Sequence, residues 1–213
     1  MRKLSLQRSA QESNDAVAAR NRDLLTRHGI YAMNLIGSPG CGKTSILEYT
    51  ARHFDGRSAA IIGDVKTALD AERIAACGVV SHAIETGGGC HLNAAQIAGI
   101  LPKLPLADLD FLFIENVGNL VCPSTFDLGE HIKVAVLSVP EGDEKVRKYP
   151  ALFVRADVIF INKVDLLDRC PYDVERVKQD ARTLRPQVKI FETSAKDGTG
   201  FEPWFDFLRQ ARR

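Results

Sequence analysis

Gly37-Ser-Pro-Gly-Cys-Gly-Lys-Thr44 matches the phosphate-loop pattern G-x-x-x-x-G-K-[ST] and decides the expected fold. The apolar run Tyr31–Ile36 precedes it, and a segment typical of a helix, 45–51, follows it. In this context of strand, glycine turn and helix, backbone N–H groups converge on a polyphosphate at the positive end of the helix. The alternative is an ordinary turn, which the adjacent lysine and threonine disfavour. The sequence therefore predicts that the chain binds a nucleoside triphosphate.

The composition is that of a globular protein. The 213 residues are 45% hydrophobic and 26% charged, which suits one domain with a substantial core. The net charge of +1 gives no indication of nucleic-acid binding. We find no signal-peptide pattern and no apolar run of membrane-spanning length, so we expect no membrane contact. Cysteines number 5, and their scatter does not resemble a disulfide framework, which favours a reducing, cytoplasmic compartment.

Apolar runs alternate with helical patterns along the chain. Strands are expected at 31–36, 59–63, 79–84, 111–114, 134–139, 158–161 and 188–191, and their near-continuous apolar character is typical of strands covered on both faces. Helices are expected at 9–28, 67–76 and 201–211, and another should begin at Pro171. The alternation predicts a three-layer α/β domain with a mainly parallel sheet, residues 29–213, after a helical extension at 1–28.

The phosphate loop assigns roles to its residues. Lys43 is expected to reach the β- and γ-phosphates, and the Thr44 hydroxyl to ligate Mg²⁺. Cys41 is expected to fill space, although a thiol at a helix N-terminus can be reactive. The nucleotide contacts expected from this stretch are Gly37, Ser38, Gly40, Cys41, Gly42, Lys43, Thr44 and Ser45.

Asn162-Lys-Val-Asp165 follows the run 158–161 and resembles the N-K-x-D base-recognition motif of GTPases. The Asp165 carboxylate can accept from both N1–H and N2–H₂ of guanine, whereas adenine has an acceptor at N1 and leaves a buried carboxylate unpaired. Asn162 is expected to contact the base or brace the phosphate loop, and the stem of Lys163 to pack on the purine. Taken alone, this motif is also compatible with a surface turn.

A second segment bears on the base. Thr193-Ser-Ala-Lys196 follows the run 188–191 and resembles the second base-contacting loop of GTPases. The contacts expected from it are Ser194, Ala195 and Lys196, with the Ala195 N–H directed at guanine O6. Together with the phosphate loop, the two segments favour GTP over ATP.

Acidic residues end two of the expected strands. Glu115 follows the run 111–114, at the position where phosphate-loop enzymes hold Mg²⁺ or its water shell. Asp64 ends the run 59–63 and is the second candidate to ligate Mg²⁺ or to orient water. Either carboxylate could instead cap a helix or face solvent, but acids gather at such sites for electrostatic reasons. We therefore expect Lys43, Asp64 and Glu115 to be catalytic. Because Glu115 departs from the D-x-x-G of Ras-like GTPases, Ras-type switching is not assumed.

Gly87-Gly-Gly-Cys-His91 places two soft ligands behind a flexible triple glycine, and Cys122 follows Glu115 closely in the sequence. Two thiolates and an imidazole suit Zn²⁺ or Ni²⁺ rather than Mg²⁺. The spacing alone equally allows two separately buried thiols and a solvated histidine, so the pattern leaves both interpretations open.

The combination of motifs resembles the HypB family, the GTPases of nickel insertion into [NiFe]-hydrogenase. The likeness runs from about residue 15 to the C-terminus and includes the stretches 63–74, 87–93, 115–123, 141–145 and 148–150. It implies a SIMIBI-type GTPase with a metal site at Cys90, His91 and Cys122, near a nucleotide-dependent dimer interface. It also implies that Lys145 and Lys148 contact nucleotide across that dimer. Residues 1–15 contain neither the cysteine-rich nor the histidine-rich metal motif of some members.

The resemblance implies a metallochaperone in which GTP binding and hydrolysis control metal binding, dimerisation and release. The implied partners are a HypA-type nickel chaperone and the hydrogenase large-subunit precursor. A urease-accessory GTPase is disfavoured because Val121-Cys-Pro-Ser124 lacks a Cys-Pro-His motif, and a cobalamin-enzyme GTPase chaperone is disfavoured by Cys90 and His91. Intact Lys43 and Thr44 argue against a zinc or nickel storage protein, and Asp165 argues against a small-molecule kinase.

Overall fold

A wholly parallel seven-stranded sheet forms the centre of the computed structural model, which describes residues 2–64 and 69–212, with side chains from residue 11 onward. The strand order is β3-β2-β4-β1-β5-β6-β7. The strands are β1 (Tyr31–Gly37), β2 (Ser58–Asp64), β3 (Val80–Glu85), β4 (Phe111–Glu115), β5 (Ile132–Ser138), β6 (Val158–Asn162) and β7 (Lys189–Thr193). The α-helices in the described ranges are α1 (Arg2–Arg27), α2 (Lys43–His53), α3 (Leu69–Ala75), α4 (Ala94–Ile100), α5 (Lys145–Lys148), α6 (Pro150–Phe153), α7 (Val174–Leu184) and α8 (Glu202–Ala211).

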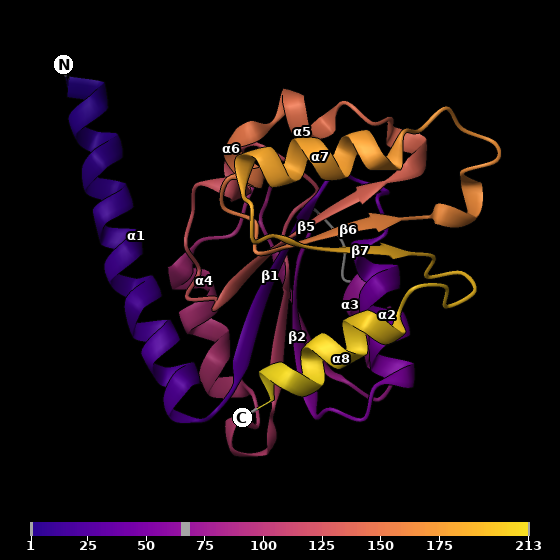
Figure 1. Ribbon diagram of the computed structural model, residues 1–213. Helices are drawn as coiled ribbons and strands as arrows, with labels where there is room; N and C mark the ends of the chain where they lie inside the picture. Colours follow the sequence, from indigo (N-terminus) through magenta and orange to yellow (C-terminus); the bar gives the residue numbers. More distant parts are fainter. Residues whose placement is uncertain (1, 65–68, 213) are drawn as a thin grey trace.

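Helices cover both faces of the sheet, which confirms the expected three-layer α/β architecture (Figure 1). Helices α2, α3 and α8 pack on one face, where Trp204 is 2% exposed and donates from Nε1 to Thr50 Oγ1 at 3.1 Å. On the other face, α1 and α4 cover one half of the sheet, and α5, α6 and α7 cover the half that contains β5 and β6. Because β4 and β6 are buried along their whole length, their sequences are continuously apolar up to the polar residue that ends each strand.

The observed helices correct some expected boundaries. Helix α7 begins at Val174 rather than at Pro171, because the Asp173 side chain accepts from the Arg176 N–H at 2.9 Å and caps the first turn. Helix α1 already begins at Arg2, ahead of the expected start at residue 9. The first two residues of the expected helix 67–76 lie outside the described residues, and α3 covers Leu69–Ala75. The strands start and end within two residues of their predicted positions.

Helix α4 was missed by the sequence analysis. The Asn93 side chain accepts from the Gln96 N–H at 2.9 Å, and the Gln96 side chain accepts in return from the Asn93 N–H at 2.9 Å. This reciprocal pair is a capping box, and its spacing is visible in the sequence. Helix α4 therefore begins directly after the Cys90-His91 loop and fixes the end of that loop.

Helix α1 runs along one side of the molecule, and its N-terminal half projects beyond the body (Figure 1). Its C-terminal half is part of the core, since Ala18 and Leu25 are fully buried. Asn21 donates to the carbonyls of Ala94 at 2.9 Å and Leu128 at 3.0 Å, which ties α1 to the start of α4. The division of the chain at residue 28 stays a prediction. None of the helices in the described residues is long and apolar enough to cross a membrane.

Candidate functional site

Three neighbouring strands end at one pocket. The register of the parallel sheet pairs Leu35 of β1 and Ile62 of β2 with Glu115, so the phosphate loop, Asp64 and Glu115 emerge side by side. They line a cavity of about 440 Å³ beyond the carboxyl ends of the strands, the usual place for a ligand in such a sheet. The expected catalytic residues Lys43, Asp64 and Glu115 all face this cavity.

Glycines allow the phosphate loop to turn tightly. Gly40 and Gly42 have positive φ angles of 76° and 99°, which L side chains rarely adopt. A β-carbon at Gly37 would lie 2.6 Å from Cys41 Sγ, so the thiol packs directly on the loop. Burial raises the pKa of Cys41 to about 11. Its thiol therefore stays protonated near neutral pH, which fits the expected space-filling role rather than a reactive one.

Lys43, Thr44 and Glu115 form a buried polar centre in the phosphate pocket. Lys43 Nζ donates to the carbonyls of Gly37 and Ser38 at 3.4 Å and lies 3.9 Å from Glu115 Oε1. The Thr44 hydroxyl donates to the same Glu115 oxygen at 3.0 Å. Burial raises the pKa of Glu115 to about 7, against the opposing effects of Lys43 and the Thr44 hydroxyl.

The other oxygen of Glu115, Oε2, is buried and has no hydrogen-bond partner among the described residues. A carboxylate oxygen beside a hydroxyl is the hard donor set that Mg²⁺ prefers. Burial without a partner is costly for a carboxylate, and a cation would offset this cost. The residues at the end of β4 therefore fit a magnesium ion.

Two residues of α3 also line the phosphate pocket and were missed by the sequence analysis. Asp70 and Arg73 form an ion pair at 2.8 Å, and Arg73 pairs as well with Glu48 of α2 at 2.5 Å. These contacts hold the start of α3 against the helix that follows the phosphate loop. The sequence signal for both residues was their position within 63–74, one of the stretches that resemble the HypB family.

The expected base-recognition residues line a second cavity of about 360 Å³ that shares Ser45 and Lys163 with the phosphate pocket. Asn162 braces the phosphate loop, because its Nδ2 donates to the Cys41 carbonyl at 3.0 Å. Lys163 has a left-handed φ of 63°, and its ammonium donates to the Gly40 carbonyl at 2.6 Å.

Asp165 and Ala195 complete this base cavity. The Asp165 carboxylate lies 3.7 Å from Lys196 Nζ at the rim, and Ala195 N–H donates to Asn162 Oδ1 at 3.4 Å. Ser194 is fully buried and is not among the lining residues. The geometry thus gathers Asn162, Lys163, Asp165, Ala195 and Lys196 around one base-sized cavity and leaves Ser194 beneath it.

Cys90, His91 and Cys122 come together at the surface. One ligand atom from each lies within 4.8 Å of the others, so the thiols are not separately buried. Cys90 Sγ is 3.4 Å from His91 Nδ1, and the His91 ring stacks on Phe126 with a centroid distance of 3.9 Å. We call these three residues the metal cluster. Gly87 and Gly88, with φ of 60° and 100°, provide the turn that brings the Cys90 loop to Cys122.

The electrostatics of the metal cluster suit a soft divalent cation. Partial burial lowers the pKa of His91, which favours its neutral, ligating form. A hydrogen bond with Cys122 raises the pKa of the Cys90 thiol. A bound metal would replace this hydrogen bond. Structural zinc sites use four protein ligands. Three donors with Cys90 exposed leave a position for a further ligand.

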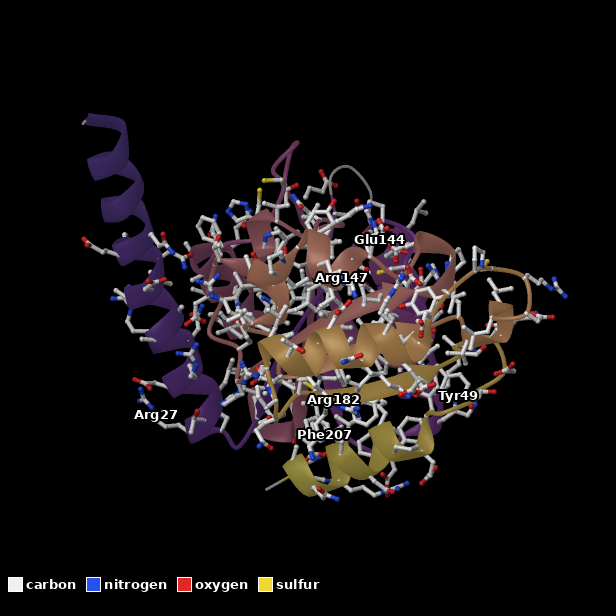
Figure 2. All side chains as sticks on the ribbon, turned by 45° about the horizontal axis from the view of Figure 1, so that its top comes forward. Arg27, Tyr49, Glu144, Arg147, Arg182 and Phe207 are labelled. Carbon is white, nitrogen blue, oxygen red and sulfur yellow. The ribbon has the colours of Figure 1, made fainter. Side chains whose placement is uncertain are left out.

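Lys145 and Lys148 lie apart from both cavities. Both lysines belong to the short helix α5 and pair with glutamates that precede it, Lys145 with Glu141 at 3.5 Å and Lys148 with Glu144 at 2.6 Å. In the view of Figure 2, Glu144 and Arg147 lie above α7, whereas Phe207 of α8 lies below it. A nucleotide contact by these lysines stays a prediction.

The fold and the phosphate pocket define a P-loop nucleotide-binding domain. The sequence model of the CobW/HypB/UreG nucleotide-binding domain matches residues 31–192. The hydrogenase maturation factor HypB of Escherichia coli K12 is 45% identical over 213 residues, which span 99% of this chain and 73% of that protein.

Two solved structures are similar to this one. HypB from Helicobacter pylori in complex with nickel has a TM-score of 0.90 at 41% identity, covering 94% of this chain and 95% of that chain. HypB from Archaeoglobus fulgidus has a TM-score of 0.87 at 44% identity, covering 95% and 100%. The chain belongs to the HypB family of hydrogenase maturation factors. The expected SIMIBI-type fold class is thereby confirmed.

Proposed function

We propose that the protein is a cytoplasmic, GTP-hydrolysing metallochaperone that handles nickel for [NiFe]-hydrogenase maturation, with metal binding set by the state of the nucleotide. The observation that carries the proposal is the path of one segment. The chain leaves β4 at Glu115 in the phosphate pocket and reaches the metal cluster at Cys122. One continuous stretch thus joins the two candidate sites.

The nucleotide chemistry is assigned to residues in the two cavities. Lys43 holds loop carbonyls through long hydrogen bonds of 3.4 Å, which its ammonium can exchange for phosphate oxygens. Thr44 and Glu115 would hold Mg²⁺, which neutralises charge on the transferred phosphoryl group. Asp64 faces the same cavity, where it can orient the attacking water. Asp165 selects guanine by accepting from its two adjacent N–H donors.

The metal cluster is proposed to hold nickel as cargo. Soft thiolates and an imidazole suit Ni²⁺ or Zn²⁺, and an open position on the surface allows transfer to another ligand set. The nickel complex of the H. pylori relative supports this assignment. A nucleotide-dependent homodimer, a HypA-type chaperone and the hydrogenase large-subunit precursor are the proposed partners.

The test is direct titration of Ni²⁺ and of Zn²⁺ into protein loaded with GDP or with a non-hydrolysable GTP analogue, with mass measured by light scattering. We expect different Ni²⁺ affinities in the two states, a dimer with the analogue, and phosphate release from GTP in preference to ATP. Equal Ni²⁺ affinities in the two nucleotide states would contradict the proposed coupling, because a ligand without differential affinity shifts no equilibrium. Phosphate release from ATP at the same rate would remove the assignment of Asp165.

A further inference from the structure

Leu92 joins the metal cluster to the sheet. It directly follows His91, and its side chain is fully buried. A β-carbon at Gly63 would lie 2.8 Å from Leu92 Cγ, so the leucine packs on the end of β2 next to Asp64. Its backbone N–H donates to Asn116 Oδ1 at 3.1 Å. The metal-binding loop therefore ends on a residue that is held by both strands of the candidate magnesium site.

Asn116 directly follows Glu115 and is also fully buried. Its backbone N–H donates to the Leu35 carbonyl at 2.9 Å, on β1 just ahead of the phosphate loop. Its side-chain Nδ2 donates to Asn34 Oδ1 at 3.1 Å. Its Oδ1 accepts from Val117 at 3.0 Å as well as from Leu92, so both acceptor positions are occupied. An amide fixed in this way transmits a displacement of the strand end to the groups bonded to it.

The residues after Asn116 touch the phosphate loop on one side and the metal loop on the other. A β-carbon at Gly118 would lie 2.8 Å from Pro39 Cγ and 3.0 Å from Pro39 N, so this backbone rests directly on the phosphate loop. Asn119 Nδ2 donates to the Cys90 carbonyl at 3.4 Å. A shift of the segment 115–119 on nucleotide binding would therefore reach the loop that carries Cys90 and His91.

We propose that Asn116 is the positioning residue that couples the phosphate pocket to the metal cluster, acting through its hydrogen bond to the Leu92 N–H. This inference rests on the proposed function and specifies its physical link. Glu115 ends β4 and directly precedes Asn116, and the Leu92 N–H is hydrogen-bonded to the Asn116 side chain. Movement of Glu115 towards a cation and a γ-phosphate would therefore move the metal loop. Cys122 lies farther along the same segment, and the spacing of the three ligands changes with it. In the competing explanation, the segment after Glu115 couples the two sites by moving Cys122 alone, and the hydrogen bond of Asn116 is not needed.

The experiment compares wild-type protein with Asn116→Ala and with the matched variant Asn93→Ala. Asn93 caps α4 at the end of the same loop, and its side chain is hydrogen-bonded to Gln96 rather than to Asn116. Ni²⁺ is titrated in the presence of GDP and of a non-hydrolysable GTP analogue, and the ratio of the two Kd values is the readout. We expect a ratio of about fivefold or more in wild-type protein and in Asn93→Ala, falling to within about twofold of unity in Asn116→Ala. Affinity for GDP should stay within about threefold of wild type in Asn93→Ala, because Asn93 lines neither nucleotide cavity. Asn116 lines the phosphate pocket, so the Ni²⁺ titrations of Asn116→Ala are made at saturating nucleotide.

The ratio separates coupling from general loosening of the loop, which would alter both Kd values together. A wild-type ratio in folded Asn116→Ala overturns the inference and leaves the proposed function standing. A ratio of unity in wild-type protein overturns both. Loss of coupling in Asn93→Ala as well as in Asn116→Ala overturns the specific role of Asn116, since any weakening of the loop would then suffice.

A second measurement needs no variant and keeps the inference testable should Asn116→Ala fail to fold. Hydrogen exchange of the Leu92 amide is followed by NMR in metal-free wild-type protein under the same two nucleotide conditions. We expect its exchange rate to change by about tenfold between them, while the amide of Gln96, which lies in α4 and is bonded to the Asn93 cap, changes by less than about twofold. Equal Leu92 rates in the two states overturn the inference.

Discussion

The phosphate pocket and the metal cluster are held in place by different means. In the phosphate pocket, Lys43 and Glu115 are 6% and 5% exposed, and three adjacent strand ends fix the backbone around them. In the metal cluster, Cys90 is exposed, and the ligands come from two loops that meet without a strand between them. The sheet therefore shapes the first site before any ligand arrives, whereas the second depends on loop positions that other parts of the molecule control.

The supporting contacts differ in the same way. Asn162 and Thr44 hold the phosphate loop and Glu115 through hydrogen bonds of 3.0 Å. Around the metal cluster, the contacts include the ring stacking of Phe126 on His91, a 3.4 Å hydrogen bond from Asn119 to the Cys90 carbonyl and a 3.1 Å hydrogen bond from the Thr125 hydroxyl to the Cys122 carbonyl. A thin supporting shell lowers the affinity of a metal site and makes its geometry adjustable. This difference suits a preformed nucleotide site that is joined to a reversible metal site.

Lys43→Ala gives the largest expected effect and tests whether the two sites can be separated. Loss of the ammonium that faces the phosphates should lower GTP hydrolysis by about 100-fold or more, measured as phosphate release. Ni²⁺ affinity of the nucleotide-free variant should equal that of wild type, because Lys43 is not part of the metal cluster. Lys178→Ala, on α7 and outside both cavities, is the control. A metal affinity that falls together with the hydrolysis rate would show that the sites are not separable.

Asp165→Asn should weaken GTP binding by about 10- to 100-fold, since a charge-assisted hydrogen-bond pair to guanine is lost. The asparagine amide can donate to a carbonyl at position 2 of the purine, so binding of xanthosine triphosphate should improve in the same variant. Competition against a fluorescent guanine nucleotide measures both changes. A variant that loses both nucleotides equally would point to a collapsed cavity instead of altered base selection.

Cys122→Ala should lower Ni²⁺ affinity by about tenfold or more, because two donors remain of three. The melting temperature of the metal-free protein should change by less than about 2 °C, since the partly exposed thiol contributes little to the core. Cys170→Ala is the matched control, as Cys170 is also partly buried and lies outside both cavities and the metal cluster. Equal nickel affinities in the two variants would contradict the assignment of Cys122.

Local patterns in the sequence were sufficient for the phosphate pocket and not for the metal cluster. The segments Gly37–Thr44 and Asn162–Asp165 are contiguous, and their residue types are dictated by the ligand chemistry, so each could be assigned before the fold was known. Cys90 and Cys122 are far apart in sequence. Cys90 follows β3 and Cys122 follows β4, and their proximity depends on the strand order β3-β2-β4, which only the three-dimensional arrangement establishes.

Two further features show where sequence patterns fail. The start of α7 depends on the Asp173 side chain reaching the Arg176 N–H, and Pro171 offers an equally plausible start in the sequence. In the sequence, Asn116 looks like an ordinary polar residue that follows a strand. Its contacts with β1 and with the Leu92 loop follow from strand order and burial, which no local pattern records.

Asp110→Asn gives the smallest expected effect and asks whether the phosphate pocket depends on the far end of the sheet. Asp110 directly precedes β4, at the end opposite Glu115, and accepts from the Arg57 backbone N–H at 3.0 Å and from its guanidinium at 2.9 Å. These hydrogen bonds hold the pKa of Asp110 below its usual value. A depressed folded-state pKa contributes stability above the unfolded-state pKa, and this contribution is lost as the pH falls through the folded-state pKa.

At neutral pH, Asp110→Asn should therefore melt about 2–4 °C below wild type, and the two melting temperatures should converge as the pH falls through the lowered folded-state pKa of Asp110. The control is Asp108→Asn, which changes an exposed acid shortly before Asp110 in the sequence and should melt like wild type throughout. Because strand ends fix the phosphate pocket locally, GTP hydrolysis and Ni²⁺ binding at 25 °C should stay within about twofold of wild type in both variants. A larger loss of hydrolysis in Asp110→Asn would mean that the phosphate pocket relies on the whole length of β4. The strand ends alone would then not explain why the nucleotide site is rigid and the metal site adjustable.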